Sequence, residues 1–122
     1  MNFSQKEISC RCGCGQRLNL ATVKMLELAR HNGGGEPIVL SSPSRCKAHN
    51  SSLKNSSPVS LHIYDMAADV IAWGKYRTDT VEGREKIAAL FRKSGWYVMI
   101  ESRWVHVDLR TMFPEILKVR LL

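Results

Sequence analysis

The 122-residue sequence predicts a single α+β domain, residues 1–122, with helices packed on a mainly antiparallel sheet. Two segments carry apolar residues at helical spacing, and four shorter apolar runs have the length and composition of strands. The last two runs are separated only by Glu101 and Ser102, which is typical of a hairpin. A chain of this length buries a sizeable core without needing disulfides.

The first helix is predicted over residues 20–30, where apolar side chains recur every three or four positions. Asn19 stands directly before this run as a cap, and the glycines at 33–35 end the helix. Residues 37–41 then read as a short buried strand.

Residues 42–60 are rich in Ser, Asn, Pro and Lys, a composition typical of a mobile surface loop. A loop of this length inside a compact domain is usually functional, however. We therefore expect this segment to serve a binding or catalytic site.

A central strand is predicted over residues 66–73, an apolar run interrupted by Asp69, whose carboxylate is expected to point out of the sheet. Asp79 and Glu82 have the spacing of a capping box, and the helix that follows is expected to end at Gly95. The hairpin strands are predicted over 96–100 and 103–109. Residues 113–122 fit an edge strand, a short helix or a docked tail equally well.

Two short motifs far apart in the chain offer the ligands of a metal site. Ser60-Leu61-His62 is followed by Asp69 seven residues after the histidine, and His106 lies in the predicted hairpin. Two imidazoles and one carboxylate are the ligand set of a catalytic zinc ion that keeps its fourth position open for water. A carboxylate within an apolar strand also needs a partner, and one Zn²⁺ ion would supply it.

These motifs resemble the zinc D-alanyl-D-alanine peptidases, a family that shares its metal-binding core with the hedgehog signalling domain. The same family carries a Ser-x-x-Arg motif, here Ser42-Pro43-Ser44-Arg45, followed by a His-Asn pair, here His49-Asn50. The resemblance runs from about residue 3 to residue 110 and is strongest to the small bacterial and phage members. It implies a hedgehog/DD-peptidase-like fold.

The resemblance also implies an activity. His62, Asp69 and His106 would hold zinc, and a zinc-activated water would cut peptide bonds next to D-alanine in peptidoglycan stem peptides, as a carboxypeptidase or an endopeptidase. Arg45 would stabilise the negative charge of the transition state. The remaining residues implied for the substrate site lie in the 42–60 segment, which makes it a substrate-facing loop: Ser42, His49, Asn50 and Ser60.

Two positions depart from the family pattern. Many members have a general base, Glu, three residues before the last histidine, where this chain has Arg103. Asp108 and Glu101 are the available substitutes, with Asp108 preferred, although Asp108 would equally serve to orient an imidazole. Asp65 replaces a usual glycine and is expected to add negative charge beside the zinc.

Four cysteines, Cys10, Cys12, Cys14 and Cys46, leave three states open. Free thiols are expected first, because the N-terminus lacks a secretory signal and cytosolic thiols stay reduced. The alternatives are a disulfide from the N-terminal segment to Cys46, or a four-thiolate zinc site. Either cross-link would fasten the N-terminal segment beside Arg45.

The chain carries a net charge of +7 without a block of like charges, so we expect no specific nucleic-acid binding. No apolar run is long enough to span a bilayer. We expect a monomeric bacterial or phage protein that stays in the cytoplasm until it is released to the cell wall. The alternative function is a non-catalytic, zinc-stabilised module that binds the wall, such as a part of a phage particle.

Overall fold

A computed structural model describes residues 3–52 and 61–111 of the chain. Ser60 and the C-terminal segment 113–122 lie outside the described residues. The described elements, in chain order, are α1 (Gln5–Ile8), α2 (Leu20–Asn32), β1 (Ile38–Ser42), α3 (Lys47–Ser52), the 3₁₀ turn η1 (Leu61–Tyr64), β2 (Ala67–Ala72), the 3₁₀ turn η2 (Gly74–Tyr76), α4 (Val81–Lys93), β3 (Tyr97–Ile100) and β4 (Val105–Asp108).

The four strands form one antiparallel sheet in the order β1-β2-β4-β3, which confirms the predicted α+β class. β3 and β4 make the predicted hairpin, with Met99 opposite His106. β4 also pairs with β2, and this pairing sets Asp69 directly opposite His106. An irregularity near the end of β1 places Ser42 opposite Asp69 on the other side of β2.

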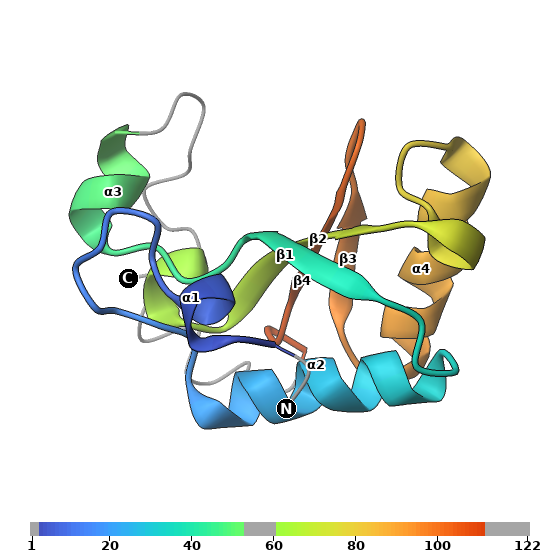
Figure 1. Ribbon diagram of the computed structural model, residues 1–122, viewed down its shortest axis with the longest axis horizontal. Coiled ribbons are helices and arrows are strands. Elements are labelled where there is room, and N and C mark those ends of the chain that lie inside the picture. The colour runs from blue at the N-terminus through green and yellow to red at the C-terminus, as the bar shows by residue number, and fades with distance from the viewer. Residues whose placement is uncertain (1–2, 53–60, 112–122) are drawn as a thin grey trace.

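The two long helices and the sheet share one hydrophobic core. Leu26 of α2 and Phe91 of α4 are fully buried in the same cluster as the strand residues Val70, Val105 and Val107. Figure 1 shows α2 running beneath the sheet and α4 at one end of it, where α4 packs against β3 and β4. Because side chains alternate along a strand, Asp69, His106 and Asp108 point to the face opposite this core.

The start of α4 corrects the predicted capping box. Thr80, rather than Asp79, is the N-cap: its Oγ1 accepts a hydrogen bond from the backbone N–H of Gly83 at 3.0 Å. Asp79 instead pairs through both carboxylate oxygens with the guanidinium of Arg77, each at 2.7 Å. An Arg two residues away offers a charged bidentate partner, which a backbone N–H does not match.

The predicted loop over 42–60 contains a helix, α3, which the composition did not indicate. The serines of α3 bond back to the helix itself, since Ser51 Oγ donates to the carbonyl of Lys47 at 2.9 Å. Asn50 is 1% exposed and anchors the helix in the protein. The second half of the segment, 53–60, lies outside the described residues.

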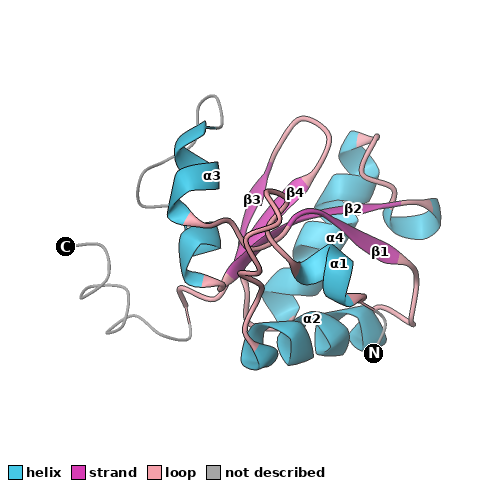
Figure 2. Cartoon of the chain, turned by 60° about the vertical axis from the view of Figure 1, so that its left-hand side comes forward, coloured by secondary structure: helices cyan, strands magenta, loops and turns pink. Residues whose placement is uncertain are grey.

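α3, η1 and the segment between α1 and α2 gather at the end of the molecule opposite α4 (Figures 1 and 2). α3 packs against η1, and η1 leads directly into β2. Across the described ranges, no helix has the length and apolar character needed to cross a membrane.

Candidate metal centre

Three side chains from three elements meet on the face of the sheet opposite the core. Asp69 Oδ1 lies 3.3 Å from Nε2 of His62 in η1 and 3.1 Å from Nδ1 of His106 in β4. The two imidazole rings approach edge to face with their centroids 5.3 Å apart. The structure therefore brings together the three residues that the sequence predicts as metal ligands.

His62 is held in the tautomer that metal binding needs. Its Nδ1 lies 2.6 Å from the backbone carbonyl of Pro43, which can only accept, so the proton is on Nδ1. The lone pair is then on Nε2, the nitrogen that faces Asp69. His62 is 1% exposed, so its ring orientation is fixed by packing as well as by this bond.

His106 is held between two carboxylates. Its Nδ1 faces Asp69, and its Nε2 lies 2.8 Å from Asp108 Oδ2. Asp108 is itself fully buried and accepts hydrogen bonds from the backbone N–H and the guanidinium of Arg110. The guanidinium stacks over the ring of Tyr97 at 3.9 Å from its centroid. This chain of contacts fixes the rotation of the His106 ring.

The charges of the cluster support one another in the metal-free protein. Burial alone would raise the pKa of Asp69, but the hydrogen bond from His106 and the close contact with the His62 ring outweigh it and hold that pKa well below its usual range. Burial alone would lower the pKa of His106, but Asp108 and Asp69 raise it to about 9. A metal cation between the two histidines and Asp69 would replace the proton of His106 as the positive charge that compensates Asp69.

The donor set fits a zinc ion. The ligating atoms of His62, Asp69 and His106 lie within 4.8 Å of one another. Neutral imidazole and carboxylate are ligands that zinc accepts, and three protein ligands leave a coordination position open. The hydrogen bonds from His62 to Pro43 and from His106 to Asp108 are the outer contacts typical of metal-binding histidines.

Arg45 belongs to the same region. Its backbone N–H donates to the carbonyl of His62 at 2.9 Å, in the stretch whose Pro43 carbonyl accepts from the His62 ring. Burial lowers the pKa of Arg45, and the negative charges of Asp69 and Cys10 oppose that shift. The guanidinium is thus partly desolvated within electrostatic range of the metal ligands.

Comparison with known protein families agrees with this geometry. The family model described as Peptidase M15 matches residues 1–108, which is most of the chain. The chain belongs to the Peptidase M15 family. No curated protein sequence and no solved structure is detectably similar to it. M15 peptidases are zinc-dependent, so family membership and the donor set point to the same metal.

The M15 substrate residues predicted from the sequence differ in their surroundings. Ser42 is half-buried and lies next to Asp69 across the β1–β2 pair. His49 is half-buried, and its backbone N–H donates to Cys46 Sγ. Asn50 is buried, and its backbone N–H donates to the carbonyl of Cys46, so its surroundings fit a role in shaping the loop. Ser60 lies outside the described residues.

Asp65 adopts a backbone conformation that glycine reaches more easily than other residues. Its φ of 62° lies in the left-handed region, which Asp tolerates better than most residues. Its carboxylate accepts hydrogen bonds from Ser44 Oγ and from Gln16 Nε2, and its carbonyl accepts from Thr22. The negative charge that the sequence analysis expected from Asp65 is therefore hydrogen-bonded to neighbouring donors. These bonds connect Asp65 to three other segments of the chain.

The two candidates for the general base also differ. Both oxygens of Asp108 are occupied by His106 and Arg110, and no part of its side chain is exposed. Glu101 is half-buried and pairs with Trp104 at the hairpin end. Because Met99 pairs with His106, strand alternation places Glu101 on the same face as His106, two residue pairs further along the hairpin.

Sequence reasoning missed the residues that support the ligands. Pro43 acts through its backbone carbonyl, which any residue would offer, so no sequence signal marks it. Arg110 had a detectable signal, since an Arg two residues after a buried Asp is a ready ion-pair partner. Gln16 and Ser44 reach Asp65 from distant parts of the chain.

Proposed function

We infer that this M15 member hydrolyses a peptide bond next to D-alanine in peptidoglycan stem peptides. One observation carries the proposal: His62 Nε2, Asp69 Oδ1 and His106 Nδ1 converge, while the second nitrogen of each imidazole is hydrogen-bonded. Such preorganised ligands with an open side are the arrangement of catalytic rather than purely structural zinc sites.

Zinc, when bound, supplies a Lewis acid that makes water a stronger nucleophile and polarises a carbonyl group. The protein's own residues orient the reactants around it. Asp69 balances positive charge between the two histidines, and Asp108 keeps the His106 ring aligned. The backbone of Arg45 is held by its bond to the His62 carbonyl, and its guanidinium would stabilise negative charge on the oxygen of the scissile peptide.

We assign the general base to Glu101 rather than to the preferred sequence candidate, Asp108. A base must exchange protons with a water molecule, and the enclosed carboxylate of Asp108 has no exposed atom with which to do so. Glu101 lies on the face that carries His106. The peptide would bind on the β1 side of Asp69, where Ser42 and the 42–60 segment would contact it.

The test is cleavage of purified muropeptides that carry pentapeptide stems, followed by mass spectrometry with and without a chelator. Release of D-alanine or of separated cross-linked stems, lost with chelator and restored by zinc, is the expected result. His62→Ala and Asp69→Ala should abolish cleavage, whereas Asp79→Asn, at an exposed ion-pair residue just before α4, should not. Cleavage that persists in both ligand variants would refute the proposal.

A non-catalytic wall-binding module is the second candidate. Arg103 occupies the position of the usual base, and the enclosure of Asp108 removes the nearest substitute, which favours this alternative. Zinc-dependent binding of intact muropeptides without any cleavage would establish it. A Glu101→Gln variant separates the two: it should lose cleavage and keep zinc if Glu101 is the base.

A further inference from the structure

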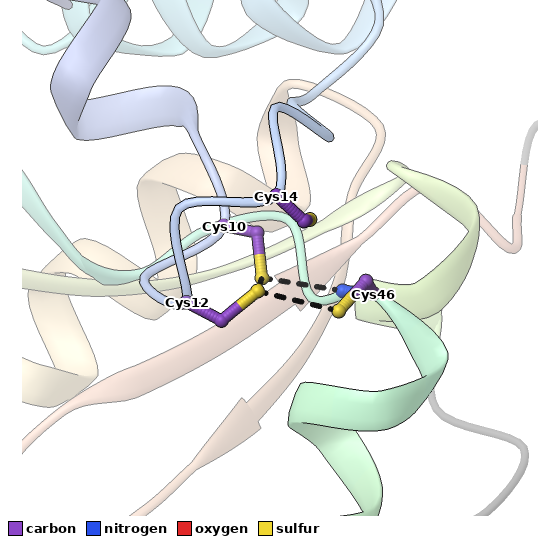
Figure 3. A group of neighbouring side chains, drawn as sticks. All are labelled: Cys10, Cys12, Cys14 and Cys46. Atoms are coloured by element: carbon purple, nitrogen blue, oxygen red, sulfur yellow. Dashed lines mark hydrogen bonds between the residues drawn. The ribbon is translucent and has the colours of Figure 1, made fainter.

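Four thiols meet at a second place in the molecule, separate from the histidine cluster. Cys10, Cys12 and Cys14 come from the segment between α1 and α2, and Cys46 directly precedes α3 (Figure 3). All four Sγ atoms lie within 4.8 Å of one another. None of the four takes part in a disulfide.

The N-terminal segment turns so that alternate cysteines converge. Side chains two residues apart on an extended strand are about 6.6 Å apart, which is too far for both to bind the same metal ion. Here the N–H of Gly13 donates to the carbonyl of Cys10 at 3.2 Å and closes a turn. Gly13, with a φ of 81°, supplies the left-handed residue of that turn. Cys10 Sγ and Cys12 Sγ are consequently 3.4 Å apart.

Cys46 closes the cluster from the other segment. Its Sγ lies 3.5 Å from Cys12 Sγ, and its backbone N–H points at Cys10 Sγ at 3.3 Å. The N–H of His49 in turn donates to Cys46 Sγ at 3.3 Å. Backbone N–H groups directed at sulfur stabilise the thiolate form, which is the form that binds metal.

We propose that Cys10, Cys12, Cys14 and Cys46 hold a structural zinc ion in a closed four-thiolate site. A tetrahedral site with zinc–sulfur bonds of about 2.3 Å has sulfur–sulfur distances of about 3.8 Å. The Cys10–Cys12 and Cys12–Cys46 sulfur separations, 3.4 and 3.5 Å, differ from that value by a few tenths of an ångström. On binding, four S–H bonds are replaced by four S–Zn bonds and up to four protons leave to solvent, with no change of oxidation state.

The arrangement favours metal over disulfides. Two disulfides would sort the sulfurs into two pairs, each at about 2.05 Å. The observed sulfurs instead form one group in which Cys12 is near both Cys10 and Cys46. Four protein ligands also leave no position for water, so the site is structural rather than catalytic.

The site would fasten two distant segments beside Arg45. Cys46 follows Arg45 directly, and Gln16, just after the cysteine turn, donates to the Arg45 carbonyl at 3.4 Å and to Asp65 at 3.0 Å. Arg11, inside the turn, donates to the carbonyl of Leu40 in β1 at 3.0 Å. Zinc at the thiols would thereby fix the position of the Arg45 backbone. This effect does not depend on whether the histidine site is catalytic.

Native mass spectrometry of the reduced full chain loaded with zinc tests the proposal. We expect two zinc ions on the wild type. The double variant His62→Ala/Asp69→Ala should keep one, and Cys12→Ser/Cys14→Ser should also keep one. One ion on the wild type together with one ion on the cysteine variant would overturn the proposal, because the histidine cluster alone would account for it.

Cobalt in place of zinc gives a readout that needs no cysteine substitution. In the reduced His62→Ala/Asp69→Ala variant, cobalt should produce the intense sulfur-to-metal charge-transfer absorption of thiolate coordination, and zinc should slow alkylation of the cysteines. Absence of that absorption, or alkylation at the same rate with and without zinc, would overturn the proposal. Failure of muropeptide cleavage with these signals intact would count against the catalytic proposal alone.

Discussion

Asp108 contacts the candidate metal centre through His106. It is fully buried, accepts from His106 Nε2, and is held by three donor atoms of Arg110. A carboxylate behind a ligand histidine fixes the ring and makes its other nitrogen a better metal donor. Zinc affinity should therefore depend on the residues that contact the ligands as well as on the ligands themselves.

Asp108→Asn should weaken zinc binding by about 10- to 100-fold, the usual effect of losing such a contact. Competition with a coloured chelator measures the affinity. The control is Asp79→Asn, which removes an exposed carboxylate paired with Arg77 and should leave affinity unchanged. Equal zinc affinity in Asp108→Asn and wild type would remove Asp108 from the metal centre.

The metal-free protein should lose stability as the pH rises above neutrality. The folded-state pKa of His106 is about 9, above its ordinary value of 6.5, so the protonated ring stabilises the fold fully below pH 6.5. That contribution disappears as the pH rises from 6.5 through about 9. We expect a fall of about 3 kcal/mol in the unfolding free energy across this window, relative to His106→Gln, in urea denaturation. If the unfolding free energies of the two proteins changed with pH in parallel, this prediction would be contradicted.

The candidate metal cluster was predictable because the identity and spacing of its residues carry the chemistry. His62, Asp69 and His106 fit a zinc set wherever the fold brings them together, and the structure does so. Our proposal of Glu101 over Asp108 rests on the burial of the Asp108 side chain, which the sequence does not reveal.

At the scale of elements, periodicity predicted α2, α4 and the hairpin well, while local competition between side chains decided the details. Asn19 caps α2 as predicted. The start of α4 differs because Arg77 engages Asp79 and leaves Thr80 to cap the helix. α3 was missed because six residues rich in Ser and Asn have no helical pattern, and its position depends on tertiary contacts with η1.

Thr80→Ala should lower the unfolding free energy by about 1 kcal/mol, the usual cost of losing a side-chain cap. Asp79→Ala should cost much less than Thr80→Ala, because the ion pair of Asp79 with Arg77 is exposed on both sides. Urea denaturation of both variants measures the difference. A larger loss of unfolding free energy in Asp79→Ala than in Thr80→Ala would show that Asp79, and not Thr80, caps the helix.

At the scale of the whole molecule, the proposed function predicts that the net charge of +7 would act on capture of the cell wall rather than on chemistry. Cell walls are polyanionic, whereas a short stem peptide carries few charges. Raising the salt from about 0.05 to 0.5 M should therefore slow digestion of intact walls several-fold while changing cleavage of a soluble stem peptide little. Turbidity loss of wall suspensions and peptide mass spectrometry measure the two rates. Equal salt dependence would show that the basic surface plays no part.

The account depends most on whether His62, Asp69 and His106 hold the zinc ion. The most direct test is an anomalous-scattering map of a zinc-loaded crystal, recorded at the zinc absorption edge. We predict a peak within bonding distance of His62 Nε2, Asp69 Oδ1 and His106 Nδ1, whether or not the four thiols hold a second ion. A zinc-loaded crystal with these three side chains ordered and no peak between them would contradict the account.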